Sequence, residues 1–123
     1  MNDAQSIKTQ INHAVRSHKI WKERLLDAIE TGESEWTPEH VAVDDRCDFG
    51  KWLNEFPQSQ RERKYNNVKD LHAQFHQEAS KILALALEGE TETAKARIGV
   101  GSHYDKLTTK LQISLELWRD LNI

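Results

Sequence analysis

Histidine takes positions in this chain that the surrounding pattern otherwise gives to apolar residues. His18 falls in one apolar seam of alternating three- and four-residue spacing, and His72 falls in another. His76 follows His72 by four residues, so on a helix the two imidazoles would share one face, about 5–6 Å apart at Cβ. A buried imidazole needs a partner for each ring nitrogen, because an unpaired buried polar group is costly. A metal ion would satisfy one nitrogen of each histidine at once.

Cys47 is the single cysteine of the chain and stands at the predicted start of a short helix. Backbone N–H groups and the helix dipole favour a thiolate there. A thiolate together with imidazoles is a ligand set that suits Zn²⁺. Because the helical period would place Cys47 opposite Phe49 and Phe56, we expect the cysteine to lie before or at the first helical residue.

The same residues also allow a simpler interpretation. A seam histidine such as His18 can be a hydrogen-bonded core residue, a histidine pair at this spacing is common on helix surfaces, and Cys47 can be a small buried apolar side chain. The other three histidines are expected at the surface or in loops. His13 lies off the apolar seam, and His40 and His103 have no partner at ligand spacing.

Apolar spacing predicts the helices that must position these residues. We expect long helices over 3–31, about 60–87 and about 91–121, and a short amphipathic helix that Pro57 ends. The long seams are Ile7, Ile11, Ala14, His18, Trp21, Leu25 and Ala28, then Tyr65, Val68, His72, Phe75, Ala79, Ile82 and Ala86, then Gly101, Tyr104, Thr108, Leu111, Leu115 and Trp118; the short seam is Phe49, Trp52, Leu53 and Phe56. The chain is therefore predicted to be all-α, an antiparallel up-and-down bundle of three long helices and one short helix that forms a single domain over residues 1–123.

The connections follow from capping residues. Gly32 and Gly89 are expected to end the helices before them, and Thr91 to cap the last helix. Residues 33–46 are predicted to be a loop.

Two further predictions concern the start of the short helix and the continuity of the last helix. Asp44 or Asp45 is expected to cap the short helix. Gly99 and Gly101 are poor helix residues, yet the apolar period resumes in phase beyond them, which favours one unbroken last helix.

Composition excludes several classes of protein. The chain has 123 residues and a formal net charge of −3, with 17 basic and 20 acidic residues interspersed. The basic residues do not cluster into a stripe that could bind a phosphate backbone, so we expect no nucleic-acid partner. Nowhere do about 18 apolar residues run together, so no membrane insertion is expected, and residues 1–10 lack the apolar run of a signal peptide. These features predict a soluble cytoplasmic domain.

Three motifs carry a resemblance to a known family. In chain order they are His18-Lys-Ile-Trp21, Cys47-Asp-Phe-Gly-Lys-Trp-Leu53 and His72-Ala-Gln-Phe-His76. Their residues and order resemble the chemoreceptor zinc-binding domain, which is found in cytoplasmic bacterial chemoreceptors and in some diguanylate cyclases. The resemblance extends over nearly the whole chain, including the pattern around Tyr104.

The resemblance implies a helical bundle with one Zn²⁺ per chain, held by His18, Cys47, His72 and His76, and usually a homodimer. No methyl-accepting or cyclase output domain accompanies these residues, so the chain is expected to be either an excised domain or a free-standing relative. Its partner would be a signalling protein or a fused output domain.

Full ligation argues against catalysis. Four protein ligands fill a tetrahedral zinc and leave no open position for water or substrate. Position 73, where a zinc protease carries its general-base glutamate, is alanine. The seams supply none of the inward carboxylates of di-iron bundles. We therefore expect that the chain is not an enzyme.

Ligands from separate helices would couple zinc occupancy to helix packing. The first hypothesis is a zinc-binding regulatory domain whose occupancy modulates bacterial signalling, in chemotaxis or through cyclic-di-GMP. The second is a redox sensor, in which hypochlorous acid or a similar oxidant converts the zinc-bound Cys47 thiolate to sulfenic acid or beyond. The third is a bundle whose zinc only holds the fold. All three stay open at this point.

Helix length gives a separate reason to expect a homodimer. Helices of 28–31 residues are roughly 42–46 Å long, and one short helix cannot cover them. We expect Ile7, Ile11, Leu115 and Trp118 to be exposed and to seek a partner.

Overall fold

The computed structural model describes residues 4–43, 47–60 and 62–120. Every regular element in that part of the chain is helical, which confirms the predicted all-α class. The helices are α1 (Ala4–Thr31), α2 (Pro38–Ala42), α3 (Asp48–Glu55), the 3₁₀ turn η1 (Gln58–Gln60), α4 (Arg63–Leu87), α5 (Thr91–Ile98) and α6 (His103–Asp120). None of these described helices combines the length and the apolar character that a membrane span requires.

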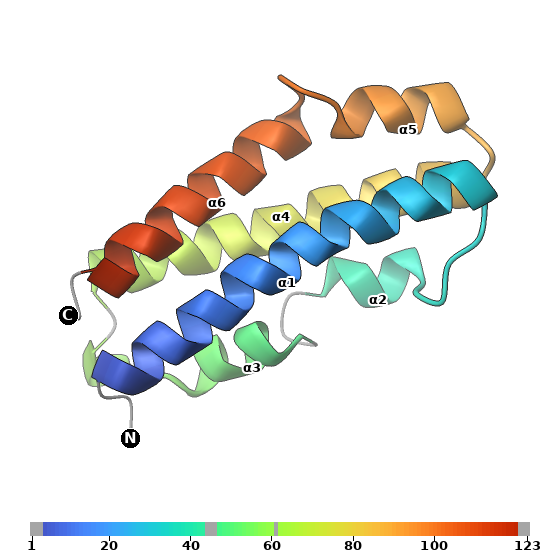
Figure 1. Ribbon diagram of the computed structural model, residues 1–123. Coiled ribbons are helices and arrows are strands. Elements are labelled where there is room, and N and C mark those ends of the chain that lie inside the picture. The colour runs from blue at the N-terminus through green and yellow to red at the C-terminus, as the bar shows by residue number, and fades with distance from the viewer. Residues whose placement is uncertain (1–3, 44–46, 61, 121–123) are drawn as a thin grey trace.

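The long helices α1, α4 and α6 lie side by side and contact one another (Figure 1). α4 and α6 run in opposite directions, since Tyr65 near the start of α4 contacts Trp118 near the end of α6, while Phe75 contacts Tyr104. α2 packs on α4, and α3 packs beside α1. The chain thus returns along the long helices through α2 and α3 before α4 begins (Figure 1).

The seams of α1 and α4 face the core, as predicted. All seven seam residues of α4 are buried, and so are the seam residues of α1 except His18 and Trp21, which are half-buried. This burial follows from the 3.6-residue period, which keeps such positions on one stripe of the helix.

The expectation of exposed seam ends is wrong. Ile7, Ile11, Leu115 and Trp118 are at most 6 % exposed. The rings of Trp52, from the short helix α3, and of Phe56, which follows it, contact Trp118, so the short segment covers the end of the bundle that seemed open. These four residues are therefore not an exposed surface for a partner.

The segment 33–46 is not simply a loop, because it contains the helix α2. Thr37 is the N-cap of α2, and its hydroxyl accepts a hydrogen bond from the His40 N–H at 3.2 Å. Pro38 occupies the first helical position, where its missing N–H costs nothing. The Ser80 hydroxyl of α4 donates to the Pro38 carbonyl at 2.7 Å and so ties α2 to α4.

The start of α3 also differs from the prediction. Asp44 and Asp45 lie outside the described residues, and the N-cap of α3 is Cys47, whose sulfur accepts from the Gly50 N–H at 3.3 Å. The next long helix begins at residue 63 rather than about 60, because residues 58–60 form a 3₁₀ turn. The Tyr65 hydroxyl then donates to the Leu53 carbonyl at 2.7 Å, which fastens α3 to α4.

The predicted continuous last helix is broken into α5 and α6. Gly101 has a φ of +82°, a left-handed conformation that a helix does not contain, and it is exposed rather than part of the seam. The Ser102 hydroxyl accepts from the Asp105 N–H at 3.2 Å, and the Asp105 carboxylate accepts from the Gly101 N–H at 2.9 Å, so the new helix start is capped. Thr91 is the first residue of α5 rather than its cap, which is Glu90. The described chain therefore has three long helices but more short ones than predicted.

Replacing Gly101 by alanine is expected to destabilise the fold by about 1–2 kcal/mol, the cost of a left-handed conformation for an L-residue with Cβ. Urea unfolding followed by circular dichroism measures this loss. Val100→Ala at the neighbouring position, which is 98 % exposed, should leave the unfolding free energy unchanged. Equal stability of both variants would contradict the role given to Gly101.

Candidate metal centre

Three of the four candidate ligands come together where the start of α3 meets the middle of α4. The Cys47 Sγ lies 3.4 Å from the His72 Nε2 and 3.6 Å from the His76 Nε2. The two Nε2 atoms lie 3.1 Å apart. The i, i+4 spacing on α4 sets the last distance, and the position of Cys47 at the N-cap sets the first two.

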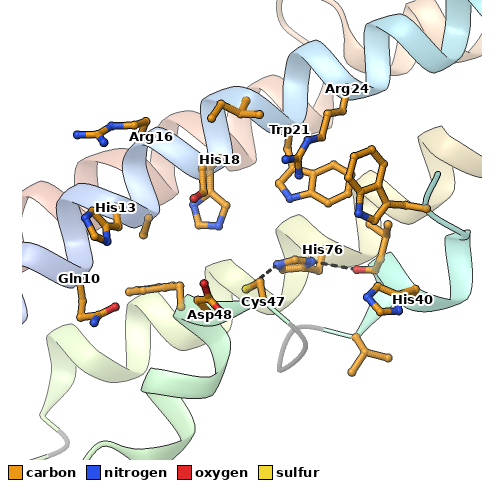
Figure 2. A pocket seen from close by; sticks show the side chains of 17 residues that line it. Gln10, His13, Arg16, His18, Trp21, Arg24, His40, Cys47, Asp48 and His76 are labelled. Atoms are coloured by element: carbon orange, nitrogen blue, oxygen red, sulfur yellow. Dashed lines mark hydrogen bonds between the residues drawn. The ribbon is translucent and has the colours of Figure 1, made fainter. Parts of the chain in front are cut away.

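His18 joins this group from α1. Its side chain points from α1 into the space above Cys47 and His76 (Figure 2). Candidate ligand atoms of His18, His72 and His76 all lie within 4.8 Å of one another. The structure therefore brings together all four residues that the sequence singles out, from three different helices or their caps.

The spacing of the donor atoms fits a tetrahedral zinc ion. With Zn–N of about 2.0 Å and Zn–S of about 2.3 Å, ligand atoms of such an ion are about 3.3 Å apart for two nitrogens and about 3.5 Å for nitrogen and sulfur. The three distances among Cys47, His72 and His76 are 3.4, 3.6 and 3.1 Å. These residues therefore present a soft sulfur and hard-to-borderline nitrogens at the separation that one small cation bridges.

The second ring nitrogen of His76 fixes which nitrogen faces the cluster. Its Nδ1 lies 2.9 Å from the Val41 carbonyl oxygen at the end of α2. A carbonyl only accepts, so Nδ1 carries the proton and donates, and a neutral His76 has its lone pair on Nε2. This is the arrangement that orients a metal-binding histidine through its outer nitrogen.

Burial keeps the other two imidazoles neutral. Desolvation, followed by the repulsion that a protonated His76 would exert, lowers the pKa of His18 from 6.5 to about 3. Desolvation, followed by repulsion from the protonated forms of His18 and His76 and from Lys69, lowers the pKa of His72 to about 2. Near neutral pH each ring therefore offers an unprotonated nitrogen, which is the form that binds metal.

Aromatic rings wall the cluster. The Phe49 ring lies edge-on to His72 at 5.2 Å between centroids, and the Phe75 ring lies 4.8 Å from that of His18. Both phenylalanines are buried. The Nδ1 atoms of His18 and His72 are buried without a hydrogen-bond partner among the described residues. Such unmet polar atoms in an apolar surround are unusual in a folded core.

A cleft leads from the surface to this cluster. It has a volume of about 520 Å³, and His18, Cys47 and His76 line its inner side (Figure 2). Cys47 is half-buried rather than sealed in the core. Small reagents in solution therefore have a route to its sulfur.

The other histidines lie away from the centre of the cluster, as predicted, and all three are exposed. His40 and His103 lie on helices rather than in loops: His40 is in α2, and His103 begins α6. The sequence does not reveal the role of Val41, because residue type says nothing about what a backbone carbonyl contacts. The Thr37-Pro38 pair, a common helix start, was the available signal for α2.

The geometry agrees with the comparisons with known proteins. The sequence model of the chemoreceptor zinc-binding domain matches residues 18–83, a range that begins at His18 and includes Cys47, His72 and His76. The match ends within α4 and so is shorter than the resemblance predicted. No curated protein and no solved structure matches the chain. Because the matched range spans more than half of the 123 residues, the chain belongs to the chemoreceptor zinc-binding domain family.

Proposed function

We propose that this chain is a zinc-binding regulatory domain in which one Zn²⁺ is held by His18, Cys47, His72 and His76. The observation that carries the proposal is the separation of three donor atoms by 3.1–3.6 Å, which are tetrahedral ligand distances. Family membership supports zinc as the metal.

The proposed site couples metal occupancy to helix packing. α1 supplies His18, the N-cap of α3 supplies Cys47, and α4 supplies the other two residues. The Val41 carbonyl holds His76, so α2 is linked to the same centre. Zinc when bound would draw these elements together within the antiparallel up-and-down bundle, and its loss would loosen them. In the proposed role this change is transmitted to chemotaxis or cyclic-di-GMP signalling, through a partner or a fused domain.

Elemental analysis together with chelator competition tests the proposal. We expect one zinc per chain in the wild type, and a large loss of zinc affinity in His18→Ala. His13→Ala is the matched control, since His13 lies on the same helix but is exposed; it should bind zinc like the wild type. A His18→Ala chain that retains the wild-type zinc affinity would remove His18 from the ligand set.

A redox role is the second candidate, favoured by the cleft that Cys47 lines. Hypochlorous acid would oxidise the Cys47 thiolate to sulfenic acid, with chloride as the reduced product, and would thereby remove a ligand. Mass spectrometry of Cys47 after oxidant, with zinc release followed by a dye, measures this. We expect stoichiometric sulfenic acid and zinc release together. A thiol that stays unmodified while zinc stays bound would exclude the redox role.

The other parts of the proposal follow from full ligation. A zinc with four protein ligands has no open position, so we propose that the domain is not an enzyme. In the third possibility zinc only holds the fold, and chelation would then unfold the chain outright rather than leave a folded apo state. The cytoplasmic location expected from the sequence stays a prediction.

A homodimer also belongs to the proposal, on a different surface from the one the sequence suggested. Ile113 and Leu117 lie one turn apart on α6 and are 52 % and 49 % exposed. Sedimentation at micromolar concentration, with Leu117→Lys as the variant, tests whether this face joins two chains.

A further inference from the structure

A second cavity lies on the other side of His18, between α1 and α6. Its volume is about 160 Å³. Val15 of α1 and Leu111 and Leu115 of α6 supply apolar walls. The two helices contact each other directly, so the cavity lies within a packed pair of helices.

Thr108 explains why the gap exists. It occupies a seam position of α6, where a larger apolar side chain would fill the space, and it also lines the cavity. Its hydroxyl donates to the Asp105 carbonyl of its own helix at 3.0 Å. The threonine is therefore satisfied locally and does not need a partner across the gap.

Tyr104 supplies a polar group that is not satisfied. Its side chain lines the cavity, the residue is only 1 % exposed, and its hydroxyl has no hydrogen-bond partner among the described residues. Burial of a hydroxyl without a partner is disfavoured unless a ligand or a water completes it. Tyr104 thus provides a hydrogen-bonding group in a mostly apolar cavity.

The charged side chains that line the cavity are all positive. Lys19 and Lys22, one turn apart on α1, are exposed and line the cavity. None of the described residues that line it is acidic. In the described part of the chain, no salt bridge joins either lysine to a carboxylate. A ligand with an apolar body and a negative group would therefore find complementary surroundings.

We propose that this cavity binds a small monocarboxylate of about the size of benzoate. A cavity of about 150 Å³ accommodates benzene, and the present one is of the same size. The apolar body would lie against Val15, Leu111 and Leu115, and the carboxylate would lie toward Lys19 and Lys22. The Tyr104 hydroxyl is the remaining hydrogen-bonding group that the ligand can engage.

Such a ligand would also lie against the proposed metal centre. His18 lines both this cavity and the cleft at the metal centre. If the proposed zinc site holds, ligand and zinc share a contact residue, and each changes the affinity of the other by the same factor. The cavity itself does not depend on zinc.

Titration of the full chain with benzoate, followed by ¹H–¹⁵N NMR, tests the proposal. We expect saturable shifts confined to α1 and α6, and binding of the neutral analogue benzamide about tenfold weaker, since one charge-assisted contact is lost. Thr108→Leu fills the cavity and should abolish the binding, whereas Thr109→Leu, at the exposed next position, should bind like the wild type. Lys22→Gln should weaken binding several-fold, and Lys110→Gln, exposed and outside the cavity, should not.

Two results would overturn the site. One is the absence of saturable shifts with benzoate; the other is equal binding by the Thr108→Leu and Thr109→Leu variants. Lys22→Gln keeps the test decisive if Thr108→Leu disturbs the fold, because the lysine is at the surface. The titration is run on zinc-loaded and on metal-free protein. A chain that binds benzoate but no zinc would refute the proposed function and leave this cavity site in place.

Discussion

Replacing Cys47 by serine is expected to lower the affinity for Zn²⁺ by more than about 100-fold, because the loss of even an outer-shell partner costs about 10–100-fold. This variant removes the thiolate without removing the helix cap. Cys47 is the N-cap of α3 and its sulfur accepts from the Gly50 N–H. Serine is among the best N-cap residues, so its hydroxyl should keep that hydrogen bond while the thiolate is lost. Chelator competition measures the affinity, and circular dichroism checks that the helices persist.

Cys47→Ala separates the two roles of the cysteine. It removes the thiolate and the cap together, so the metal-free alanine variant should be less stable than the metal-free serine variant by about 1 kcal/mol. Both variants should bind zinc equally poorly. A serine variant that holds zinc as tightly as the wild type would contradict the assignment of Cys47 as a ligand.

Lowering the pH from about 7 to about 5 is expected to destabilise the metal-free protein by roughly 4 kcal/mol. In the unfolded chain His18 and His72 take up protons as the pH falls through their ordinary pKa of 6.5, but in the fold their pKa values are about 3 and about 2. The unfolded state therefore binds more protons throughout this window, and stability falls as the pH falls. Each histidine contributes roughly 2 kcal/mol over that range. Urea unfolding at a series of pH values measures the slope.

Variants of single histidines show which residues cause the pH dependence of the unfolding free energy. Metal-free His18→Gln should lose about half of the pH dependence, whereas His103→Gln, exposed at the start of α6, should keep all of it. An unfolding midpoint that does not move between these pH values would show that His18 and His72 are not held neutral in the fold.

The position of the candidate ligands was predictable because it depends on local periodicity. The three- and four-residue spacing places His18 and His72 on the stripes that face the core, and the structure buries His72 completely and His18 in large part. The same period predicted that Cys47 lies before or at the first residue of α3, and Cys47 is the N-cap of that helix. Helical repeat and cap preference act over a few residues, so residue order alone carries them.

The breaks in the helices were less predictable. The apolar period continues in phase across residues 99–102, yet the chain turns there. Gly101 and the Ser102–Asp105 cap lower the free-energy cost of a break. Packing on α4 keeps both α5 and α6 in place. The burial of Trp118 likewise depends on Trp52 and Phe56, which come from a segment distant in the sequence. Tertiary contacts can override a local preference of about 1 kcal/mol per residue.

By itself the sequence determined the helical class, the core stripes and the four residues that could share a metal, since all three follow from residue type and spacing along a helix. Tertiary structure alone decided how close those residues lie, that the Val41 carbonyl orients His76, and that Thr108 leaves a cavity beside His18. The physical reason is that a backbone carbonyl and an unfilled volume belong to no residue type; they exist only once separate helices have packed together.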